Sequence, residues 1–192
     1  MTSPAARRHH SFADYLDVEE MSPAVKHELV DGGIFAMAGG TIEHAALSAA
    51  VSALLVAQLR GTPCRAYSSD LRIRIREASV GTYADAAVVC DPVERDLDSP
   101  THVTNPRVVV ESLSASTEDY DRNEKRIYYQ MLPSLQEYIL VAQDRRRVEV
   151  WRRSEGTWQH SVFEAGAQAS IPSIRVELDV NEIYDLAGVF VP

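Results

Sequence analysis

The runs Asp85-Ala86-Ala87-Val88-Val89-Cys90 and Val108-Val109-Val110-Glu111 set the central sheet of this chain. Each is a short apolar run bounded by turn residues, which is the pattern of a buried β-strand. Each also carries a carboxylate at one end, and such a carboxylate is costly to desolvate unless it has a partner. On neighbouring strands the two acids converge, and a divalent cation is a natural partner for them. The pair therefore predicts a metal-dependent hydrolase.

Helices and strands alternate around these two runs and end in a late antiparallel meander. A capping box, with Ser11 as the cap and Asp14 three residues on, predicts the first helix. The expected elements, in residue numbers, are a helix to about 20, a hairpin over 27–37, a helix over 42–60, strands over 71–76, 82–90 and 107–113, a helix over 120–132, a meander over 137–163, a strand at 176–178 and a helix at 182–186. This order predicts an α+β fold with a mixed β-sheet flanked by helices.

Length and composition are those of one globular domain over residues 1–192, with residues 1–10 expected to be flexible. The net charge of −9 argues against a protein that coats nucleic acid, although a nuclease with a bound metal ion is compatible with it. No apolar stretch reaches the length of a membrane span, and no secretory signal is recognisable. Cys64 and Cys90 form neither a metal-ligand spacing nor a disulfide framework, so we expect a cytoplasmic protein.

A lysine completes the candidate site. Asp85 and Glu111 lie 26 residues apart, and Lys125 follows on the expected helix with Tyr129 one turn further. Two acids and a lysine are the minimum set for metal-assisted phosphodiester cleavage. The acids hold a cation that lowers the pKa of a bound water, and the ammonium group orients that water or stabilises the transition state.

An ordered series of motifs adds a resemblance. The chain resembles the Uma-two family of restriction endonuclease-like proteins, a branch of the PD-(D/E)XK nuclease superfamily, over about residues 12–186. The motifs are His27-Glu28-Leu29-Val30-Asp31-Gly32, His44, Ser68-Ser69-Asp70-Leu71-Arg72, Tyr83-Ala84-Asp85, Val110-Glu111-Ser112-Leu113-Ser114, Tyr120-Asp121 with Lys125 and Tyr129, and Pro133-Ser134-Leu135-Gln136-Glu137-Tyr138.

The resemblance implies a restriction endonuclease-like core and roles for four residues. Asp85 stands at the metal-binding aspartate, Glu111 at the second acid, and Glu28 at an auxiliary acid. Lys125 stands for a catalytic lysine that has migrated from a strand to a helix. Leu113 occupies the position where the wider superfamily has the lysine of E-x-K, so catalysis depends on Lys125 reaching the acids; the replacement of proline by Ala84 is milder.

Structural interpretations stand beside each of these functional ones. Asp85 and Glu111 could sit in water at strand ends or form ion pairs, and Glu28 could be an exposed strand residue. Asp70 is a second carboxylate near the metal or a partner of nearby backbone at a strand kink. His44 is a weak candidate on a helix start, and Tyr129 is at least partly helix packing.

Two groups of side chains away from the acids have open roles as well. Arg72, Arg74 and Arg76 share a strand face, either as phosphate contacts or as a solvated edge. Trp151 and Trp158 are expected in the core or at an oligomer contact rather than stacked on bases.

Three functions therefore compete. The first is an endonuclease that hydrolyses DNA with Mg²⁺ or Mn²⁺, expected to be a homodimer because cutting both strands favours two-fold symmetry. The second is a catalytically degenerate nuclease fold that binds nucleic acid or protein. The third is a metal hydrolase of small phosphate esters.

Overall fold

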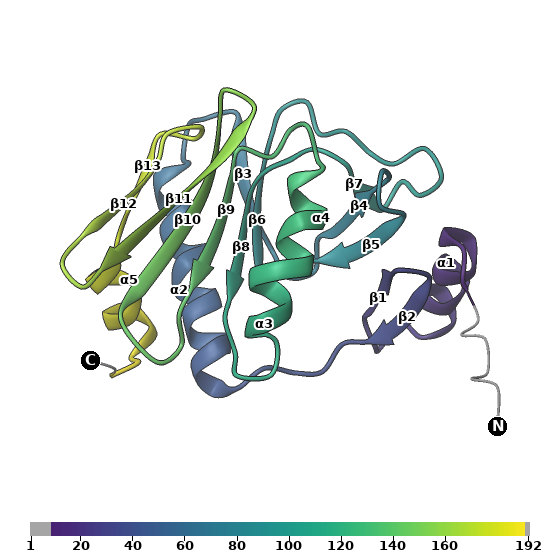
Figure 1. Ribbon diagram of the computed structural model, residues 1–192, viewed down its shortest axis with the longest axis horizontal. Helices are drawn as coiled ribbons and strands as arrows, with labels where there is room; N and C mark the ends of the chain where they lie inside the picture. Colours follow the sequence, from purple (N-terminus) through teal and green to yellow (C-terminus); the bar gives the residue numbers. More distant parts are fainter. Residues whose placement is uncertain (1–8, 191–192) are drawn as a thin grey trace.

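The computed structural model describes residues 9–190 and consists of two main β-sheets with helices packed on them (Figure 1). Most of the segment that we expected to be flexible, residues 1–8, lies outside the described residues. His10 belongs to the expected flexible segment 1–10 but is described, and its backbone N–H donates to the carbonyl of Gly32 at 2.8 Å. That bond joins the start of the described chain to the first hairpin.

The first sheet has five strands in the order β2-β1-β5-β4-β7. All neighbours are antiparallel except β4 and β7. Its strands are β1 (His27–Val30), β2 (Gly33–Ala36), β4 (Arg72–Ile75), β5 (Val80–Tyr83) and β7 (His102–Val103). The expected hairpin over residues 27–37 is therefore confirmed.

The second sheet has six strands in the order β11-β10-β9-β8-β6-β3. Only β8 and β9 run parallel, so the sheet is mixed, and β9, β10 and β11 form the expected meander. Its strands are β3 (Cys64–Ser68), β6 (Ala86–Cys90), β8 (Pro106–Ser112), β9 (Glu137–Val141), β10 (Arg147–Ser154) and β11 (Thr157–Glu164). A separate ribbon joins β12 (Gln168–Ile171) to β13 (Val176–Asp179). The α+β fold with a mixed sheet is confirmed.

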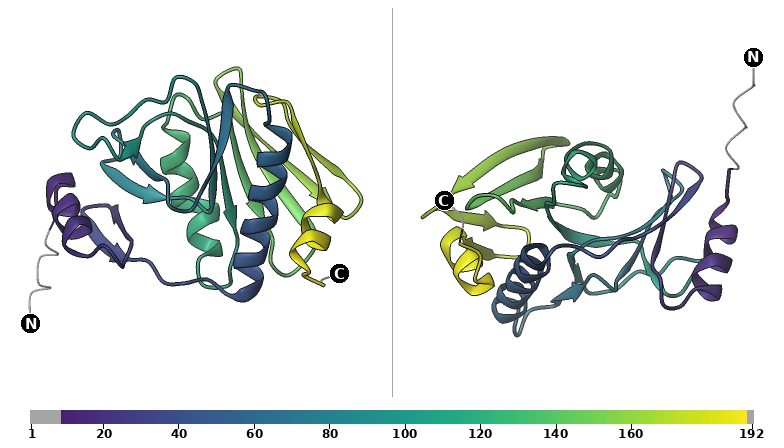
Figure 2. Two further views of the ribbon diagram at one scale, coloured as in Figure 1. Left: turned by 180° about the vertical axis from the view of Figure 1, so that it is seen from behind. Right: turned by 90° about the horizontal axis from the view of Figure 1, so that it is seen from below.

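Helices cover both faces of the six-stranded sheet, which lies between them in the view from below (Figure 2). On one face, α2 (Ile42–Gln58) and α5 (Val180–Ala187) bury Leu47, Leu55 and Ile183. On the other face, a continuous helical segment buries Tyr129. That segment consists of α3 (Glu118–Tyr120), the π-helical turn η1 (Asp121–Lys125) and α4 (Arg126–Gln130).

The remaining helix, α1 (Phe12–Met21), packs on the five-stranded sheet and begins at the expected capping box. The Ser11 hydroxyl accepts a bond from the Asp14 backbone, and the Asp14 carboxylate accepts one from the Ser11 backbone. These bonds satisfy orphan N–H groups at the helix start. The local sequence was sufficient to locate this helix.

The single strand expected over residues 82–90 is wrong. The chain forms β5 in one sheet, breaks at Ala84 and Asp85, and continues as β6 in the other sheet. A continuous apolar run does not reveal such a break, because residues on both sides of it are buried. The break places Asp85 where the two sheets meet.

The expectation that Cys64 and Cys90 do not form a disulfide is also wrong. They stand opposite each other in the antiparallel β3–β6 pair, with Cα atoms 3.8 Å apart, and are joined by a disulfide. The two cysteines lie 26 residues apart in the sequence, and only the register of the β3–β6 pair brings them together. The cysteines therefore no longer support a reducing compartment. Within residues 9–190, no helix is long and apolar enough to cross a membrane.

The three arginines expected to share this strand face contact other groups of the protein, and of the three only Arg76, just after β4, is exposed. Arg74 is buried, and its guanidinium lies 3.8 Å from the ring centre of Phe12. Arg72 forms an ion pair with Glu19 at 3.0 Å, while the partner of Arg76 is Asp96, at 2.7 Å. These arginines hold α1 and the 91–105 loop to the first sheet.

The two tryptophans of the meander lie where packing was expected. Trp151 and Trp158 are partly buried against the core beneath α4. The guanidinium of Arg126 lies 4.2 Å from the ring centre of Trp151, and that of Arg153 lies 4.6 Å from Trp158. Both rings are already covered by an arginine.

Candidate active site

Strand register brings the two predicted acids together. The antiparallel β6–β8 pair sets Ala86 opposite Val110, so Asp85 and Glu111 come one step beyond the last pair. Side chains that face each other across such a pair project to the same side of the sheet. The backbone N–H of Ser112 donates to Asp85 Oδ2 at 2.7 Å, which fixes the carboxylate at this edge.

Glu111 is a buried acid whose nearest charged partner is Lys125. The residue is only 2% exposed. Its Oε1 lies 3.0 Å from Lys125 Nζ, but the two atoms are not aligned for a hydrogen bond. Burial raises the pKa of Glu111 well above its usual value, and the charges of Asp85 and Asp121 raise it further against the opposing effect of Lys125. Burial therefore disfavours the charged form of Glu111, and Lys125 favours it.

Lys125 is the hub of the acid cluster. Its Nζ also lies 3.6 Å from Glu28 Oε1 and 3.7 Å from Asp121 Oδ1. Burial by itself lowers the pKa of the ammonium group, but the charges of Glu111 and Glu28 raise it well above the usual value. Lys125 therefore stays protonated, which suits a hydrogen-bond donor and a fixed positive charge but not a general base.

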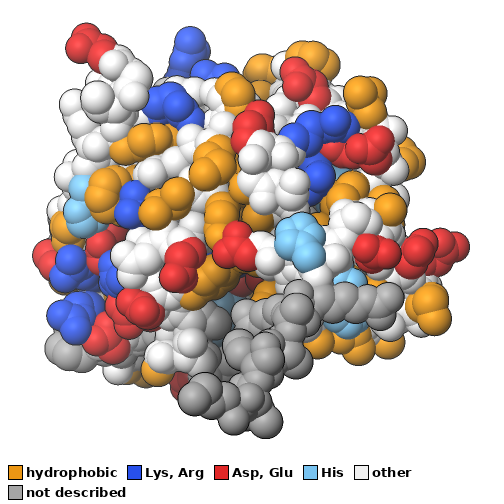
Figure 3. Space-filling model, turned by 45° about the vertical axis from the view of Figure 1, so that its right-hand side comes forward, with side chains coloured by type: hydrophobic (Ala, Val, Ile, Leu, Met, Phe, Trp, Pro, Cys, Tyr) orange, Lys and Arg blue, Asp and Glu red, His pale blue; other side chains and the backbone are white. Residues whose placement is uncertain are grey.

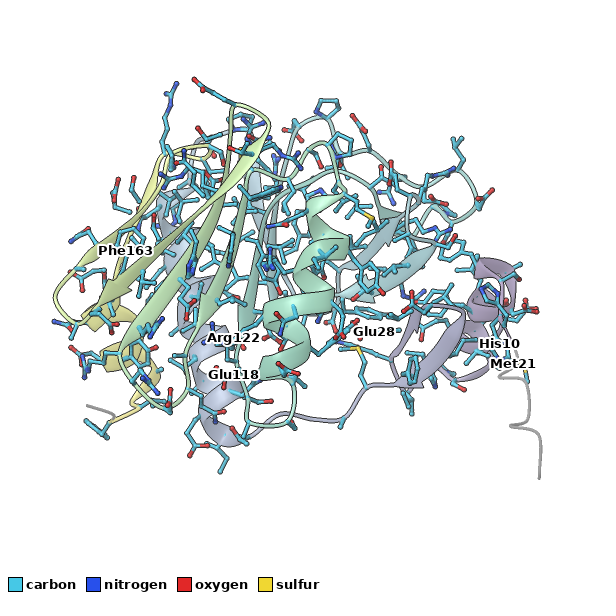
Figure 4. The ribbon with its side chains drawn as sticks, viewed as in Figure 1. His10, Met21, Glu28, Glu118, Arg122 and Phe163 are labelled. Atoms are coloured by element: carbon cyan, nitrogen blue, oxygen red, sulfur yellow. A yellow bond between two sulfur atoms is a disulfide. The ribbon has the colours of Figure 1, made fainter. Side chains whose placement is uncertain are left out.

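The lysine sits on a π-helical turn. The turn η1 runs from Asp121 to Lys125, and such turns occur frequently at functional sites. The Tyr138 hydroxyl donates to the Asp121 carbonyl at 2.9 Å. On the same segment Arg122 pairs with Glu118 at 2.6 Å and with Glu149 of β10 at 2.7 Å (Figure 4). These bonds anchor the turn to the sheet.

Asp121 was quoted in a sequence motif but not assigned to the site. Its carboxylate is buried beside the lysine, and burial raises its pKa against the opposing effect of Lys125. The signal that could have found it is its spacing, since Asp121 precedes Lys125 by one helical turn.

Glu28 comes to the cluster from the other sheet. It lies on β1 of the hairpin, on the side next to the helical segment (Figure 4). Its Oε1 accepts a hydrogen bond from the Thr82 hydroxyl and one from the backbone N–H of Tyr83 at 3.4 Å. The cluster therefore forms at the junction of the two sheets.

His44 joins the site through Asp85. It lies in the first turn of α2, and its Nε2 is 3.0 Å from Asp85 Oδ2. The hydrogen bond to Asp85 raises the pKa of His44, while burial opposes that shift. The next turn of the helix brings Ser48, whose hydroxyl donates to Ser112 Oγ at 2.9 Å. Ser48 carries no signal in the sequence because serines are common on helices, whereas Ser112 lies in the quoted motif that begins at Val110 but was given no role.

Two weaker candidates have different surroundings. Asp70 is not part of the cluster: its side chain is 81% exposed and forms an ion pair with Lys26 at 2.6 Å. Tyr129 is fully buried one turn after Lys125, with its ring centre 5.7 Å from that of Tyr138. Burial raises the pKa of Tyr129 well above its usual value, and Glu111 adds to the shift. Tyr129 is a neutral packing residue against the cluster.

The cluster offers carboxylate oxygens but is not a finished metal site. Among residues 9–190, no group of three or more His, Cys, Asp or Glu side chains is arranged to hold a metal ion. Lys125 instead lies against Glu111. The donors nevertheless fit Mg²⁺, which takes oxygen ligands and is commonly held by one or two carboxylates. The buried Glu111 oxygen that lacks an aligned donor is the atom a cation would satisfy.

Comparison with known proteins identifies the family of this chain. Residues 12–181 match the model of the Uma2 family, described as "Putative restriction endonuclease". The chain belongs to this family. Two relatives from Synechocystis sp., the uncharacterized proteins slr1290 and sll1609, are 37% and 33% identical to it; the alignments cover 89% of both chains in the first case, and 73% of this chain and 79% of the relative in the second.

A solved structure has the same fold. It is described as a "putative nuclease belonging to DUF820" from Anabaena variabilis. It superposes with a TM-score of 0.75 at 19% sequence identity, over 92% of this chain and 98% of that one. At that identity the likeness establishes the fold, and the resemblance inferred from the sequence motifs is confirmed.

Proposed function

We propose that this member of the Uma2 family is a metal-dependent endonuclease that hydrolyses DNA phosphodiester bonds. The observation that carries the proposal is the cluster itself, in which Glu28 and Glu111 of two different sheets meet at Lys125 with Asp85 alongside. Gathering four charged groups at a sheet junction, with Glu111 and Lys125 buried, costs stability, and perturbed ionisable groups gather at functional sites. Family membership supports nuclease chemistry in particular.

Each residue has a distinct part in the proposal. Asp85 and Glu111 hold Mg²⁺ or Mn²⁺, with Glu28 assisting. When bound, the ion supplies an activated water and neutralises charge on the phosphate. Lys125 remains an ammonium group and donates hydrogen bonds to the phosphate or to the attacking water. His44 and the Ser112 backbone hold Asp85 in one orientation.

The test is direct. Purified protein is incubated with supercoiled plasmid in Mg²⁺, in Mn²⁺ or in EDTA, and nicking is followed on a gel. Cleavage with either metal ion and none in EDTA supports the proposal. A panel of nucleotides and small phosphate esters, run in parallel, separates a DNA nuclease from a general phosphoesterase.

A second candidate function is a nuclease fold that binds nucleic acid or protein without cutting. Two observations favour it: Lys125 pairs with Glu111 where an ion would bind, and Leu113 stands where the wider superfamily has a lysine. Retention of DNA with no cleavage in any metal ion, unaffected by Lys125→Ala, would select this function over the first.

Assembly and location complete the proposal. We propose a homodimer, because two sites related by a two-fold axis can cut both strands of a duplex. Light scattering of the purified protein measures its mass in solution. We propose that the protein acts in the cytoplasm, where DNA is accessible. Cell fractionation tests this location.

A further inference from the structure

A separate cavity opens beside the acid cluster, between the β1–β2 hairpin and the segment α3–η1–α4. Its volume is about 380 Å³, which lies in the range of small-ligand sites. We call it the aromatic pocket because three rings and three carboxylates form its walls: Phe35, Tyr120 and Tyr128 with Glu28, Asp31 and Glu124. Glu28 belongs both to this pocket and to the cluster around Lys125.

Tyr128 packs against the core, but core packing does not explain the other two rings of the aromatic pocket. Phe35 is 48% exposed, and the Tyr120 hydroxyl is buried without a hydrogen-bond partner. Buried polar groups in native proteins are nearly always paired, so a lone hydroxyl on a cavity wall suggests a missing partner. The Phe35 ring lies over Gly33, where an added Cβ would come within 2.6 Å of it. The ring can lie beside the cavity only because Gly33 has no side chain in the space that the ring occupies.

A second groove, of about 670 Å³, reaches the cluster from the Asp85 side. Lys26 and His44 line it together with small residues, among them Gly39, Gly40, Ala45, Ser48 and Ala49. Small side chains leave room for a backbone, and hydroxyl groups and a lysine suit phosphate oxygens. One cavity therefore offers space for a sugar-phosphate chain, the other offers rings for a base, and the acid cluster joins the two.

We propose that the aromatic pocket binds one unpaired nucleobase of the strand that is cut, so that the substrate is single-stranded, or opened, at the cleavage position. The proposal rests on the nuclease function proposed above. Bases inside a duplex are stacked on both faces, and enzymes that place a base in a pocket bind single strands or flip the nucleotide out. Stacking on aromatic side chains is the usual way in which proteins hold unpaired bases.

The carboxylates give the pocket a chemical preference. Adenine, cytosine and guanine carry exocyclic amino groups that donate hydrogen bonds to carboxylates, whereas thymine has none. Acidic and hydrophobic side chains lie next to one another on the face that Figure 3 shows. We therefore expect amino-bearing bases to bind more tightly than thymine.

The experiment uses a short single-stranded oligonucleotide with one 2-aminopurine, whose fluorescence falls when it stacks on an aromatic ring. The protein is titrated in EDTA, so binding is measured without cleavage. Wild type should quench the signal, and Phe35→Ala should weaken binding at least about fivefold, as expected for one lost base–aromatic stack. Gly33→Ala, which displaces the ring without removing it, should weaken binding as well. Phe190→Ala is the matched control because Phe190 is exposed and does not line the pocket.

Two results would overturn the pocket assignment. One is equal quenching by wild type and Phe35→Ala, and the other is displacement of the oligonucleotide by spermidine from wild type and Phe35→Ala alike, which would make the pocket a site for organic cations. Failure of the nuclease proposal looks different: the wild-type protein would cut no DNA in Mg²⁺ or Mn²⁺ while the quenching in EDTA persisted.

Discussion

The ammonium nitrogen of Lys125 lies 3.0 Å from Glu111 Oε1, and both side chains are buried. The contact joins a π-helical turn to the central strand of the sheet, and its two charges depend on each other for compensation. Removing one partner of a buried pair leaves an unpaired charge, which costs more than the pair contributes.

Lys125→Met should therefore destabilise the protein by about 3–5 kcal/mol, measured as the free energy of unfolding in urea. The double variant Lys125→Met/Glu111→Gln should recover part of that loss, because the buried charge of Glu111 is removed while Glu28 and Asp121 still lack the ammonium group. Lys125→Arg keeps the charge and serves as the control. A single Lys125→Met variant as stable as wild type would show that the pair does not hold the turn in place.

Replacing either acid should weaken metal binding without unfolding the protein. We expect Asp85→Asn and Glu111→Gln each to weaken Mn²⁺ binding at least about tenfold, since even groups that only orient metal ligands are worth 10–100-fold in affinity. Isothermal titration calorimetry measures the dissociation constants, and plasmid nicking should fall in parallel.

Asp70→Asn is the matched control for these two variants, because Asp70 is an exposed carboxylate paired with Lys26 outside the cluster. Unchanged Mn²⁺ affinity in both Asp85→Asn and Glu111→Gln would remove these acids from the metal site. An equal loss in Asp70→Asn would point to non-specific binding of the ion by surface carboxylates.

Stability should fall in mild acid because of His102. This histidine is fully buried, and burial together with the charge of Arg72 lowers its pKa to about 4, from 6.5 for a free histidine. Because the pKa of His102 is lower in the folded protein than in the unfolded chain, its contribution to stability is fully present above pH 6.5. That contribution is lost as the pH falls from 6.5 towards 4, because the unfolded chain then binds the proton more readily.

The loss from this one group should amount to about 3 kcal/mol by pH 4, at 1.36 kcal/mol for each unit of pKa difference. Urea unfolding of wild type and His102→Gln at pH 4–7 separates it from other groups. The difference in stability between the two proteins should shrink as the pH falls. A difference that stays constant over this range would mean that His102 does not titrate in this way.

Reduction of the disulfide should destabilise the fold. Cys64 and Cys90 close a loop of 26 residues, and removing a link of that kind typically costs about 2–4 kcal/mol. Dithiothreitol and the double variant Cys64→Ser/Cys90→Ser should lower the melting temperature by similar amounts. Mass spectrometry under non-reducing conditions confirms the bond. Dithiothreitol should have no effect on the double variant.

Features with a short-range cause were predictable. The Ser11–Asp14 capping box starts α1, the Asp31-Gly32 turn closes the first hairpin, and strand-forming runs separated by turn residues mark the meander. The motif series also named Glu28 and Lys125, which meet in the structure. Each of these signals lies within a few residues along the chain, where local propensity operates.

Features with a long-range cause were not predictable. The break at Ala84–Asp85, the Cys64–Cys90 pair and the burial of Arg74 under Phe12 all depend on which strands become neighbours. The π-helical turn over Asp121–Lys125 also has no residue pattern that predicts it. Strand register and sheet order result from the packing of the whole chain, and side-chain periodicity does not encode them.

Residue identity alone determined which chemical groups this protein can bring to a site: carboxylates at strand ends, a lysine on a helix, and the element types that carry them. The tertiary structure decided that the carboxylates of Glu28 and Glu111 share one ammonium group, because the chain passes from one sheet to the other at Asp85 and so brings the two sheets together there. Charge pairing acts over a few ångströms in space, and that distance is fixed by packing between residues that are far apart in the chain.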